Sequence, residues 1–255
     1  MIDDGFYCMD CFDGMAQIDD KSVDMILCDL PYGTTQCSWD VVIPFEPLWA
    51  EYKRIIKDNG AIVLFGMEPF SSYLRLSNIE MYKYDWIWDK VKGTGFLNAK
   101  KQPMRNHEVI SVFYKQQCKY HPQMSQNHKR KTSLKKHNAP QTKVYGKMDK
   151  ATYYDSTMRY PRSIQVFSTD TQKSSIHNTQ KPIALCEYLI KTYTDVGDLV
   201  LDNCAGSCST GIACHNTGRR FIGFEKDEEI FKKAKQRLVE HKSQISLFDL
   251  GMERK

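Results

Sequence analysis

Residues 23–33 constrain the fold more than any other stretch of the sequence. An apolar run at 23–28 predicts a buried strand, and Pro31 ends it abruptly. Asp29 and Tyr32 are therefore expected together at the carboxyl end of a strand, where open α/β sheets bind their ligands. A carboxylate beside an aromatic ring suits a flat polar ring with an exocyclic amine, because the acid can accept a hydrogen bond and the ring can stack. The alternative is a strand-ending turn with a surface acid.

Strands and helices alternate along much of the remaining chain. A short strand at 6–9 precedes Asp10, so Asp10 and Asp29 are expected to end neighbouring strands at one edge of the sheet. Asn59 and Gly60 are expected to end a helix. Apolar runs predict further strands at 61–65, 84–88, 109–114, 199–202 and 220–224, and helical spacing predicts helices at 15–18, 44–57, 69–76, 183–193, 212–216 and 227–241. The alternation predicts an α/β fold with a doubly wound, Rossmann-like sheet.

The last third of the chain has the form of a nucleoside-binding site. Small residues at 203–211 follow the predicted strand that ends at Asp202, and Glu225 ends the next strand. A turn of small residues lets a ligand approach the backbone, and an acid at the following strand end can accept both hydroxyls of a ribose. No Gly-Lys-Ser/Thr sequence follows the turn, so it is not a Walker-type phosphate loop. The alternative is an α/β half without a ligand.

Charge is unevenly distributed along the sequence. Residues 90–163 contain 17 Lys and Arg against three acids, a net charge of +14, whereas the remainder carries −9. A basic middle in an acidic body predicts a segment that faces nucleic acid, with a solvated lysine-rich surface as the alternative. Residues 118–175 are poor in aliphatics and too long for an ordinary loop, so we interpret them as an inserted recognition region that orders fully on its polymer. The candidate DNA-binding residues are Lys100, Lys101, Arg105, Lys129, Arg130, Lys131, Lys135 and Lys136.

The composition excludes several other classes of protein. Hydrophobic residues make up 41% of the 255 residues, enough to bury a full core, but no run of eighteen apolar residues could span a membrane. The acidic start of the chain does not resemble a signal peptide, so a cytoplasmic protein with reduced cysteines is expected. A zinc site built from Cys8, Cys11, Cys204 and Cys208 is an alternative, but the signatures of strong zinc sites are absent, and no metal is predicted.

These pieces, in this order, resemble the amino-methylating DNA methyltransferases that use S-adenosylmethionine. Asp29-Leu30-Pro31-Tyr32 is similar to the family's catalytic Asp-Pro-Pro-Tyr, and residues 202–211 resemble its cofactor loop, Asp-x-x-x-Gly-Ser-Gly-x-Thr. Residues 177–188 match the His-x-Thr-Gln-Lys-Pro block of the family's β group. The catalytic motif precedes the cofactor loop, which is the circularly permuted order of that group. The implied domains are a catalytic half at 1–117, a target-recognition insert at 118–175 and a cofactor-binding half at 176–255.

The resemblance implies a role for each matching residue. Asp29 and the carbonyl of Leu30 accept hydrogen bonds from the target amine, Pro31 completes the motif, and Tyr32 stacks on a flipped base. Leu30 departs from the family's proline but keeps the carbonyl, whereas Cys208 replaces a glycine and is expected to crowd the cofactor or to force the backbone away from values that only glycine tolerates. The implied cofactor-binding residues are Asp10, Thr179, Lys181, Asp202, Asn203, Ala205, Gly206, Ser207, Ser209, Thr210 and Glu225.

The implied reaction is transfer of a methyl group to the N6 amine of adenine at a specific short sequence in duplex DNA, by base flipping. Asp29 at the first motif position favours adenine N6 over cytosine N4 in this family. The alternatives are an N4-cytosine DNA methyltransferase, an RNA adenine methyltransferase and a catalytically impaired DNA-binding homologue. Beyond double-stranded DNA, the candidate partners are a second copy of the chain and a cognate restriction endonuclease, as in restriction-modification systems.

Overall fold

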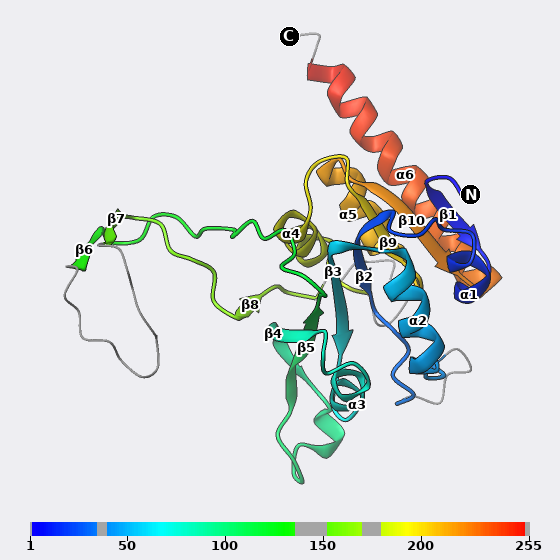
Figure 1. Ribbon diagram of the computed structural model, residues 1–255, viewed down its shortest axis with the longest axis horizontal. Coiled ribbons are helices and arrows are strands. Elements are labelled where there is room, and N and C mark those ends of the chain that lie inside the picture. Colours follow the sequence, from blue (N-terminus) through cyan, green and yellow to red (C-terminus); the bar gives the residue numbers. More distant parts are fainter. Residues whose placement is uncertain (1, 35–39, 136–151, 170–179, 253–255) are drawn as a thin grey trace. The chain divides into compact units, whose positions relative to one another are not determined.

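The computed structural model describes residues 2–34, 40–135, 152–169 and 180–252 (Figure 1). The chain forms two compact units: a main unit of Met1–His121 and Ser163–Lys255, and a small unit of Pro122–Arg162. None of the helices in the described ranges has the length and apolar character needed to cross a membrane.

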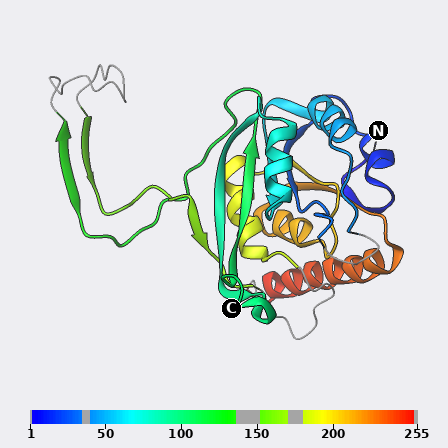
Figure 2. The ribbon, with the colours of Figure 1, turned by 90° about the horizontal axis from the view of Figure 1, so that it is seen from below.

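The main unit contains an eight-stranded sheet with the order β1-β10-β9-β2-β3-β5-β4-β8. The first five strands in this order are mutually parallel, β5 is antiparallel to both β3 and β4, and β8 is parallel to β4. Figure 2 shows β4 and β5 side by side. The strands are β1 (Gly5–Cys8), β2 (Val23–Cys28), β3 (Ile56–Gly66), β4 (Tyr82–Thr94), β5 (Arg105–Phe113), β8 (Ile164–Val166), β9 (Leu199–Asp202) and β10 (Arg220–Glu225).

Helices cover both faces of this sheet, which confirms the predicted α/β fold. Successive residues of β2 point to opposite faces: Ile26 joins a core that contains residues of α1, α2 and α3, whereas Leu27 joins a second core with residues of α4 and α5. Burial on both faces explains why the central strands are continuous apolar runs. The helices are α1 (Cys11–Met15), α2 (Phe45–Ile55), α3 (Phe70–Ser77), α4 (Ile183–Tyr193), α5 (Ser209–Thr217) and α6 (Glu228–Met252), with a short 3₁₀ helix, η1 (Phe96–Asn98).

Three local expectations were wrong. The first helix begins at Cys11 rather than at residue 15, because the carboxylate of Asp10 caps it by accepting from the Phe12 N–H at 2.8 Å. Helix α2 ends at Ile55, and the turn residues at 59–60 lie within β3. Strands β10 and β9 lie between β1 and β2, so Asp10 and Asp29 share the carboxyl edge of the sheet but do not end neighbouring strands.

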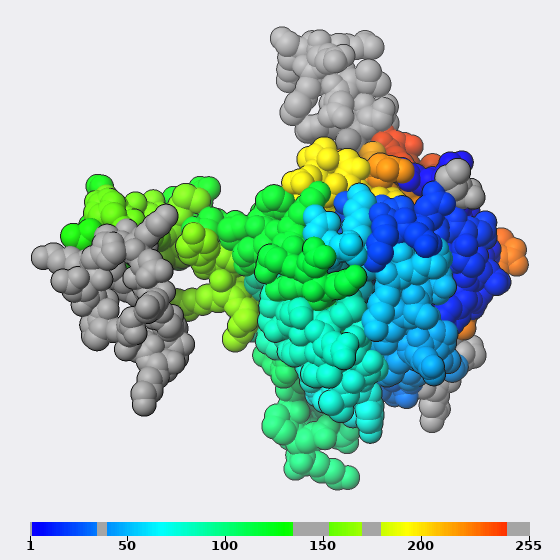
Figure 3. Space-filling view, in the orientation of Figure 1, coloured from blue at the N-terminus to red at the C-terminus, as the bar shows by residue number. Residues whose placement is uncertain are grey.

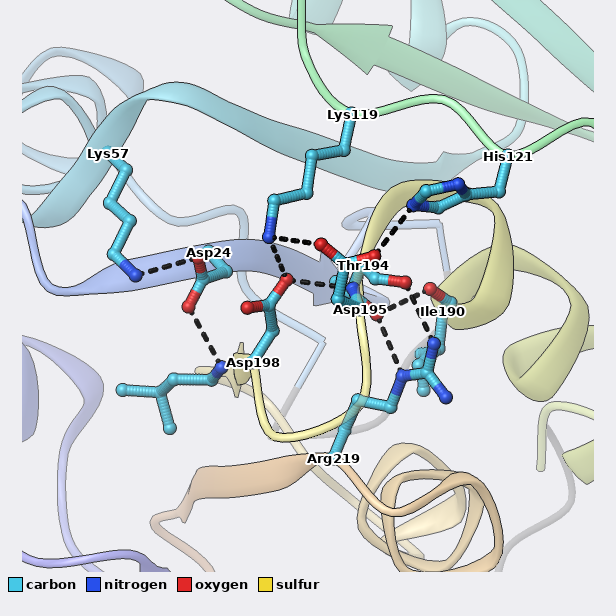
Figure 4. Close-up of polar contacts among 10 residues, drawn as sticks. Asp24, Lys57, Lys119, His121, Ile190, Thr194, Asp195, Asp198 and Arg219 are labelled. Carbon is cyan, nitrogen blue, oxygen red and sulfur yellow. Dashed lines mark hydrogen bonds and ion pairs between the residues drawn. The ribbon is translucent and has the colours of Figure 1, made fainter.

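A polar network fastens the opposite, amino-terminal edge of the parallel strands (Figure 4). The Asp24 carboxylate pairs with Lys57 at 2.7 Å and accepts the Leu199 N–H at 3.0 Å, so it ties β2 to β9. Lys119, which follows β5, lies 2.5 Å from Asp198 and 2.8 Å from Asp195 in the turn before β9. These contacts hold together parts of the main unit that are far apart in the sequence.

The small unit contains one antiparallel pair, β6 (Lys131–Lys135) and β7 (Thr152–Ser156). An isolated bridge between Ser125 and Arg159 continues the pairing of its two chain segments. Arg130 forms an ion pair with Asp155 at its exposed surface. This polar hairpin was not predicted from the sequence, since its strands carry no clear apolar alternation.

Candidate functional site

A cavity of about 980 Å³ opens at the carboxyl ends of the parallel strands. Its walls include Asp10 after β1, Asp29 after β2, Asp202 at the end of β9 and Glu225 at the end of β10. The parallel order explains this convergence, because strands that run in one direction bring the residues that follow them to the same edge. The two halves of the predicted site therefore share one cavity.

The catalytic tetrapeptide is held by hydrogen bonds within its own loop. The Tyr32 hydroxyl donates to Oδ1 of Asp29 at 2.5 Å, and the Tyr32 ring packs on Phe70 with a centroid separation of 5.0 Å. The backbone N–H groups that follow the motif, at positions 33 and 34, donate to the buried carboxylate of Asp40 at 2.8 and 2.9 Å. Leu30 is buried in the core below, so the loop is fixed from both sides.

Asp29 also belongs to a buried chain of alternating charges. Nζ of Lys181 lies 2.6 Å from Oδ2 of Asp29 and 3.2 Å from Oε2 of Glu108, and Lys90 pairs with the other carboxylate oxygen of Glu108. Oε2 of Glu108 is buried and, among the described residues, has no partner besides this ion pair with Lys181. The side chains of Lys181 and Glu108 are each only 9% exposed, which makes their mutual charge compensation necessary.

The pKa values of the two acids in this charge chain shift in opposite directions. Burial raises the pKa of Asp29, the ammonium of Lys181 opposes this shift, and the charge of Glu108 reinforces it. Burial acts in the same direction on Glu108, but the two lysines beside it overcome that effect and lower its pKa. Burial disfavours the ammonium of Lys181, yet its two carboxylate neighbours raise the pKa well above the ordinary value. Asp29 is therefore the less compensated carboxylate of the pair.

The small-residue turn after β9 forms the other side of the cavity. The carboxylate of Glu225 accepts from the Gly206 N–H at 3.0 Å and from the Asp227 N–H at 2.9 Å. Gly206 has φ +50°, and a Cβ on it would meet no atom within 4 Å, so the turn leaves open space for a ligand against its backbone. The amide of Asn203 accepts from the Tyr52 hydroxyl at 2.5 Å. Burial raises the pKa of the neighbouring Asp202 to about 6.

Cys208 does not crowd this cavity. Its thiol is fully buried in a small cluster with Ile212, Ala234 and Leu238, on the side of α5 and α6, and it is not part of the cavity lining. The second part of the expectation, that cysteine would force the backbone away from values that only glycine tolerates, was also wrong, because Cys208 keeps the left-handed conformation with φ +60°. The departure from glycine therefore strains the turn without filling the ligand space.

The structure brings most of the predicted cofactor residues to the cavity wall. Lys181 lies there too, but it contacts Asp29 rather than the turn after β9. Thr179 and Lys136 lie outside the described residues. The cavity lining includes Asp10, Asp29, Leu30, Pro31, Tyr32, Lys181, Asp202, Asn203, Ala205, Gly206, Ser207, Ser209, Thr210 and Glu225.

The candidate DNA-binding residues divide between the two units. Lys100, Lys101 and Arg105 are exposed in the main unit, and Arg105 also lines the cavity. Those of the small unit lie on or beside β6, where Arg130 is already paired with Asp155. The described candidates of the small unit are Lys129, Arg130, Lys131 and Lys135.

The sequence analysis gave no role to several polar residues of the cavity wall. Lys90 and Glu108 come from the antiparallel pair β4–β5, and Asp40 comes from the segment before α2. Gln180 has a buried amide whose nitrogen and oxygen both lack a hydrogen-bond partner. A weak signal existed for Glu108, since it is the one acid between residues 90 and 148 and it opens an apolar run. Across the parts of the chain that the structure describes, no cluster of three or more potential metal ligands is found.

Comparison with curated proteins gives relatives over nearly the whole chain. The Type II methyltransferase M1.MboII of Moraxella bovis is 28% identical over 256 residues, which cover 89% of this chain and 93% of the relative. The DNA adenine methyltransferase YhdJ of Escherichia coli K12 is 26% identical over 245 residues, with 88% and 79% coverage.

Solved structures give the same result for the fold. The crystal structure of the M1.HpyAVI–SAM complex matches with a TM-score of 0.61 and 25% identity, covering 91% of this chain and 98% of that one. The cytosine-N4-specific PvuII DNA methyltransferase matches with a TM-score of 0.63 at 14% identity, covering 96% and 93%, a likeness of fold alone. The N6/N4 methyltransferase profile, described as DNA methylase, matches residues 23–236, and the chain therefore belongs to this family of DNA methylases.

Proposed function

We propose that this DNA methylase transfers a methyl group from S-adenosylmethionine to the N6 amine of adenine in duplex DNA, at a specific short sequence and by base flipping. One observation carries the proposal: Asp29 and Tyr32 share a single cavity with the Gly206 turn and Glu225. An acceptor for an amine and a cradle for a nucleoside therefore face the same space. A volume of about 980 Å³ is at the upper end of the range for ligand pockets and is large enough for two ligands together.

The residues of the cavity fit S-adenosylmethionine. The open backbone at Gly206 would lie against its methionine end, and the half-buried carboxylate of Glu225 would accept the ribose hydroxyls. The unpartnered amide of Gln180 offers a ligand in this space both a donor and an acceptor. When bound, the cofactor supplies an electrophilic methyl group on a sulfonium. The relative M1.HpyAVI has been solved in complex with this molecule, which supports the assignment.

The protein's part in the reaction is to prepare the amine. The lone pair of an exocyclic amine is delocalised into its ring, so acceptors must hold the two N–H groups while the nitrogen becomes tetrahedral. In this proposal the Asp29 carboxylate and the Leu30 carbonyl accept these two N–H groups. When the new N–C bond forms and the C–S bond breaks, the amine loses one proton, and the Asp29 carboxylate would receive it. Tyr32 offers a ring on which the flipped base stacks.

The choice of adenine rests on Asp29 and on the relatives. An acid at the first motif position is the pattern of the adenine enzymes that the sequence resembles, and the relative YhdJ is a DNA adenine methyltransferase. The second candidate is methylation of cytosine N4, because the fold matches the cytosine-N4-specific PvuII enzyme over 96% of this chain. Both amines would meet the same pair of acceptors, since both bases present an amine donor beside a ring nitrogen.

We further propose that residues 118–175 recognise the target sequence and that the chain follows the permuted order of the β group. The compact unit Pro122–Arg162 lies within that range, and its described residues include the basic candidates Lys129, Arg130 and Lys131. The catalytic tetrapeptide precedes the Gly206 turn in the chain, as a permuted order requires. The relatives named as Type II methyltransferases favour a role beside a restriction endonuclease.

The test is incubation of the purified protein with labelled S-adenosylmethionine and unmethylated genomic DNA, followed by digestion and separation of the nucleosides. Label in N6-methyladenosine is expected, and label in N4-methylcytosine would replace the proposed base. Asp29→Ala should lower methyl transfer by at least about 100-fold, because it removes the acceptor and the proton's destination. Calorimetry should show that this variant still binds the cofactor. A fully active Asp29→Ala protein would contradict the mechanism, and equal methylation of an RNA of the same sequence would contradict the substrate class.

A further inference from the structure

The hairpin between β4 and β5 ends in an exposed apolar tip. Phe96 and Leu97, in η1, expose 79% and 97% of their surface, the highest values among the large apolar residues that the structure describes. In Figures 1 and 3 the hairpin, coloured blue-green, projects from one end of the main unit. Burial of large apolar side chains is favourable, so contact of this tip with an apolar partner would contribute binding energy.

The tip has a defined conformation. Gly95 turns the chain with φ +89°, and the Asn98 and Ala99 N–H groups donate to the carbonyls of Gly95 and Phe96 at 2.9 and 3.0 Å. The N–H groups of Lys101 and Gln102 then donate to the Asn98 carbonyl at 2.8 and 3.0 Å. Because these bonds close a tight helical turn, the two apolar side chains are presented outward together.

Positive charge surrounds the tip. Residues 91–107 contain Lys92, Lys100, Lys101 and Arg105 and no acid. None of these three lysines forms an ion pair with a described residue. Two apolar side chains surrounded by cations suit a partner with a negative surface and an apolar interior. A nucleic-acid duplex has both, in its phosphates and its stacked bases.

The base of the hairpin forms part of the cavity wall. Thr94, Gly95, Gln102, Pro103 and Arg105 line the same cavity as Asp29. The tip therefore stands at the cavity that would receive a flipped base. A base that leaves the duplex opens a gap in the stack, and the protein element nearest to that gap is the one that can enter it.

We propose that Phe96 and Leu97 form a wedge that enters the DNA duplex beside the target base and fills the space vacated by flipping. This inference rests on the proposed function, because it needs a duplex and a flipped base. Lys92, Lys100 and Lys101 would contact the flanking phosphates and hold the tip in register, while the apolar pair replaces the lost stacking.

The experiment starts by mapping the methylated sequence in DNA treated with the wild-type protein. Steady-state methylation is then measured on a matched duplex of that sequence and on one with a mismatch opposite the target base, whose flipping is easier. The variant Phe96→Ala/Leu97→Ala should lose about 10- to 100-fold in kcat/KM on the matched duplex. It should regain most of that loss on the mismatched duplex and should bind S-adenosylmethionine as the wild type does. Leu76→Ala, which truncates a residue that is 70% exposed on α3, is the matched control and should lose nothing.

Each other outcome overturns the proposal. Unchanged activity of the double variant on the matched duplex excludes a wedge, and an equal loss on both duplexes assigns the tip a role that is independent of flipping. A change from dimer to monomer in light scattering would assign the tip to a second copy of the chain instead. Failure of the wild type to methylate any DNA would overturn the proposed function and with it the wedge, and is therefore distinct from a defect seen only in the variant.

Discussion

At the scale of single residues, Asp29 is the centre of the site and its neighbours set its charge. The titratable groups that face it come from several elements, and in the proposed mechanism the carboxylate accepts the amine proton only when it is ionised. Activity should therefore fall as the pH drops through its pKa, which burial raises. The facing groups are Cys28, Tyr32, Glu108, Lys181, Cys186 and Asp202, and Lys90 acts on Glu108 behind them.

Two substitutions should move this pH dependence in opposite directions. The charge of Glu108 raises the pKa of Asp29, so Glu108→Gln should shift the acid limb of kcat to lower pH. Lys90→Gln leaves Lys181 as the one cation beside Glu108 among the described residues. Lys181 then stabilises the ionised form of Asp29 less, so the acid limb should shift to higher pH. The measurement is the pH profile of methyl transfer for both variants. Shifts in the same direction would mean that the charge chain does not tune Asp29.

Cys208 offers a test of backbone strain that is separate from catalysis. Left-handed φ costs a non-glycine residue about 1–2 kcal/mol, and both Cys208→Gly and Cys208→Ala remove the buried thiol. Only glycine also relieves the strain, so the glycine variant should be more stable than the alanine variant by roughly 1 kcal/mol in urea unfolding. Its affinity for the cofactor should equal that of the wild type, because the thiol lies outside the cavity lining. An alanine variant as stable as the glycine variant would show that the turn is unstrained.

At the scale of elements, the parallel strands were predictable from the sequence, whereas the antiparallel pair β4–β5 was only partly predictable. The helix at 183–193 and the strand at 199–202 were predicted with their observed bounds, because Pro182 and a continuous apolar run are local signals. The positions of Asp29 and Glu225 followed from the same logic, since each stands where a buried strand ends. Glu108 reaches the site through its pairing with Trp88 across β4 and β5, a register that no local pattern encodes.

Asp24 was also missed, although it joins two elements of the core. It lies inside an apolar run, and its carboxylate holds the first N–H of β9 and the ammonium of Lys57. Asp24→Ala should lower the free energy of unfolding by about 2–4 kcal/mol, because a buried N–H loses its acceptor, whereas Asp24→Asn keeps an acceptor and should lose less. Urea unfolding measures both variants, with Asp20→Ala at a mostly exposed ion pair as a control that should change by under about 1 kcal/mol. Equal losses for the alanine and asparagine variants would show that the contact with the β9 backbone contributes nothing.

At the scale of the whole molecule, the protein is an acidic body that carries its positive charge in one segment. Residues 90–163 hold a net +14 against −9 elsewhere, so attraction to DNA should come from that segment rather than from the protein's net charge of +5. The basic residues of this segment include those of the β4–β5 hairpin of the main unit and those of strand β6 of the small unit. Each unit thus carries cations that a polyanion could contact.

This charge distribution predicts how salt acts on binding. Each phosphate contact that is lost lowers the slope of log K against log salt by nearly one for B-DNA. Lys100→Gln/Lys101→Gln should therefore reduce the magnitude of the slope by about 2, measured by fluorescence anisotropy on a labelled duplex between low and moderate salt. Lys232→Gln/Lys235→Gln removes the same charge from α6, outside the basic segment, and should leave the slope unchanged. If both variants lower the slope equally, DNA binding depends on the total charge of the protein rather than on the cations of residues 90–163.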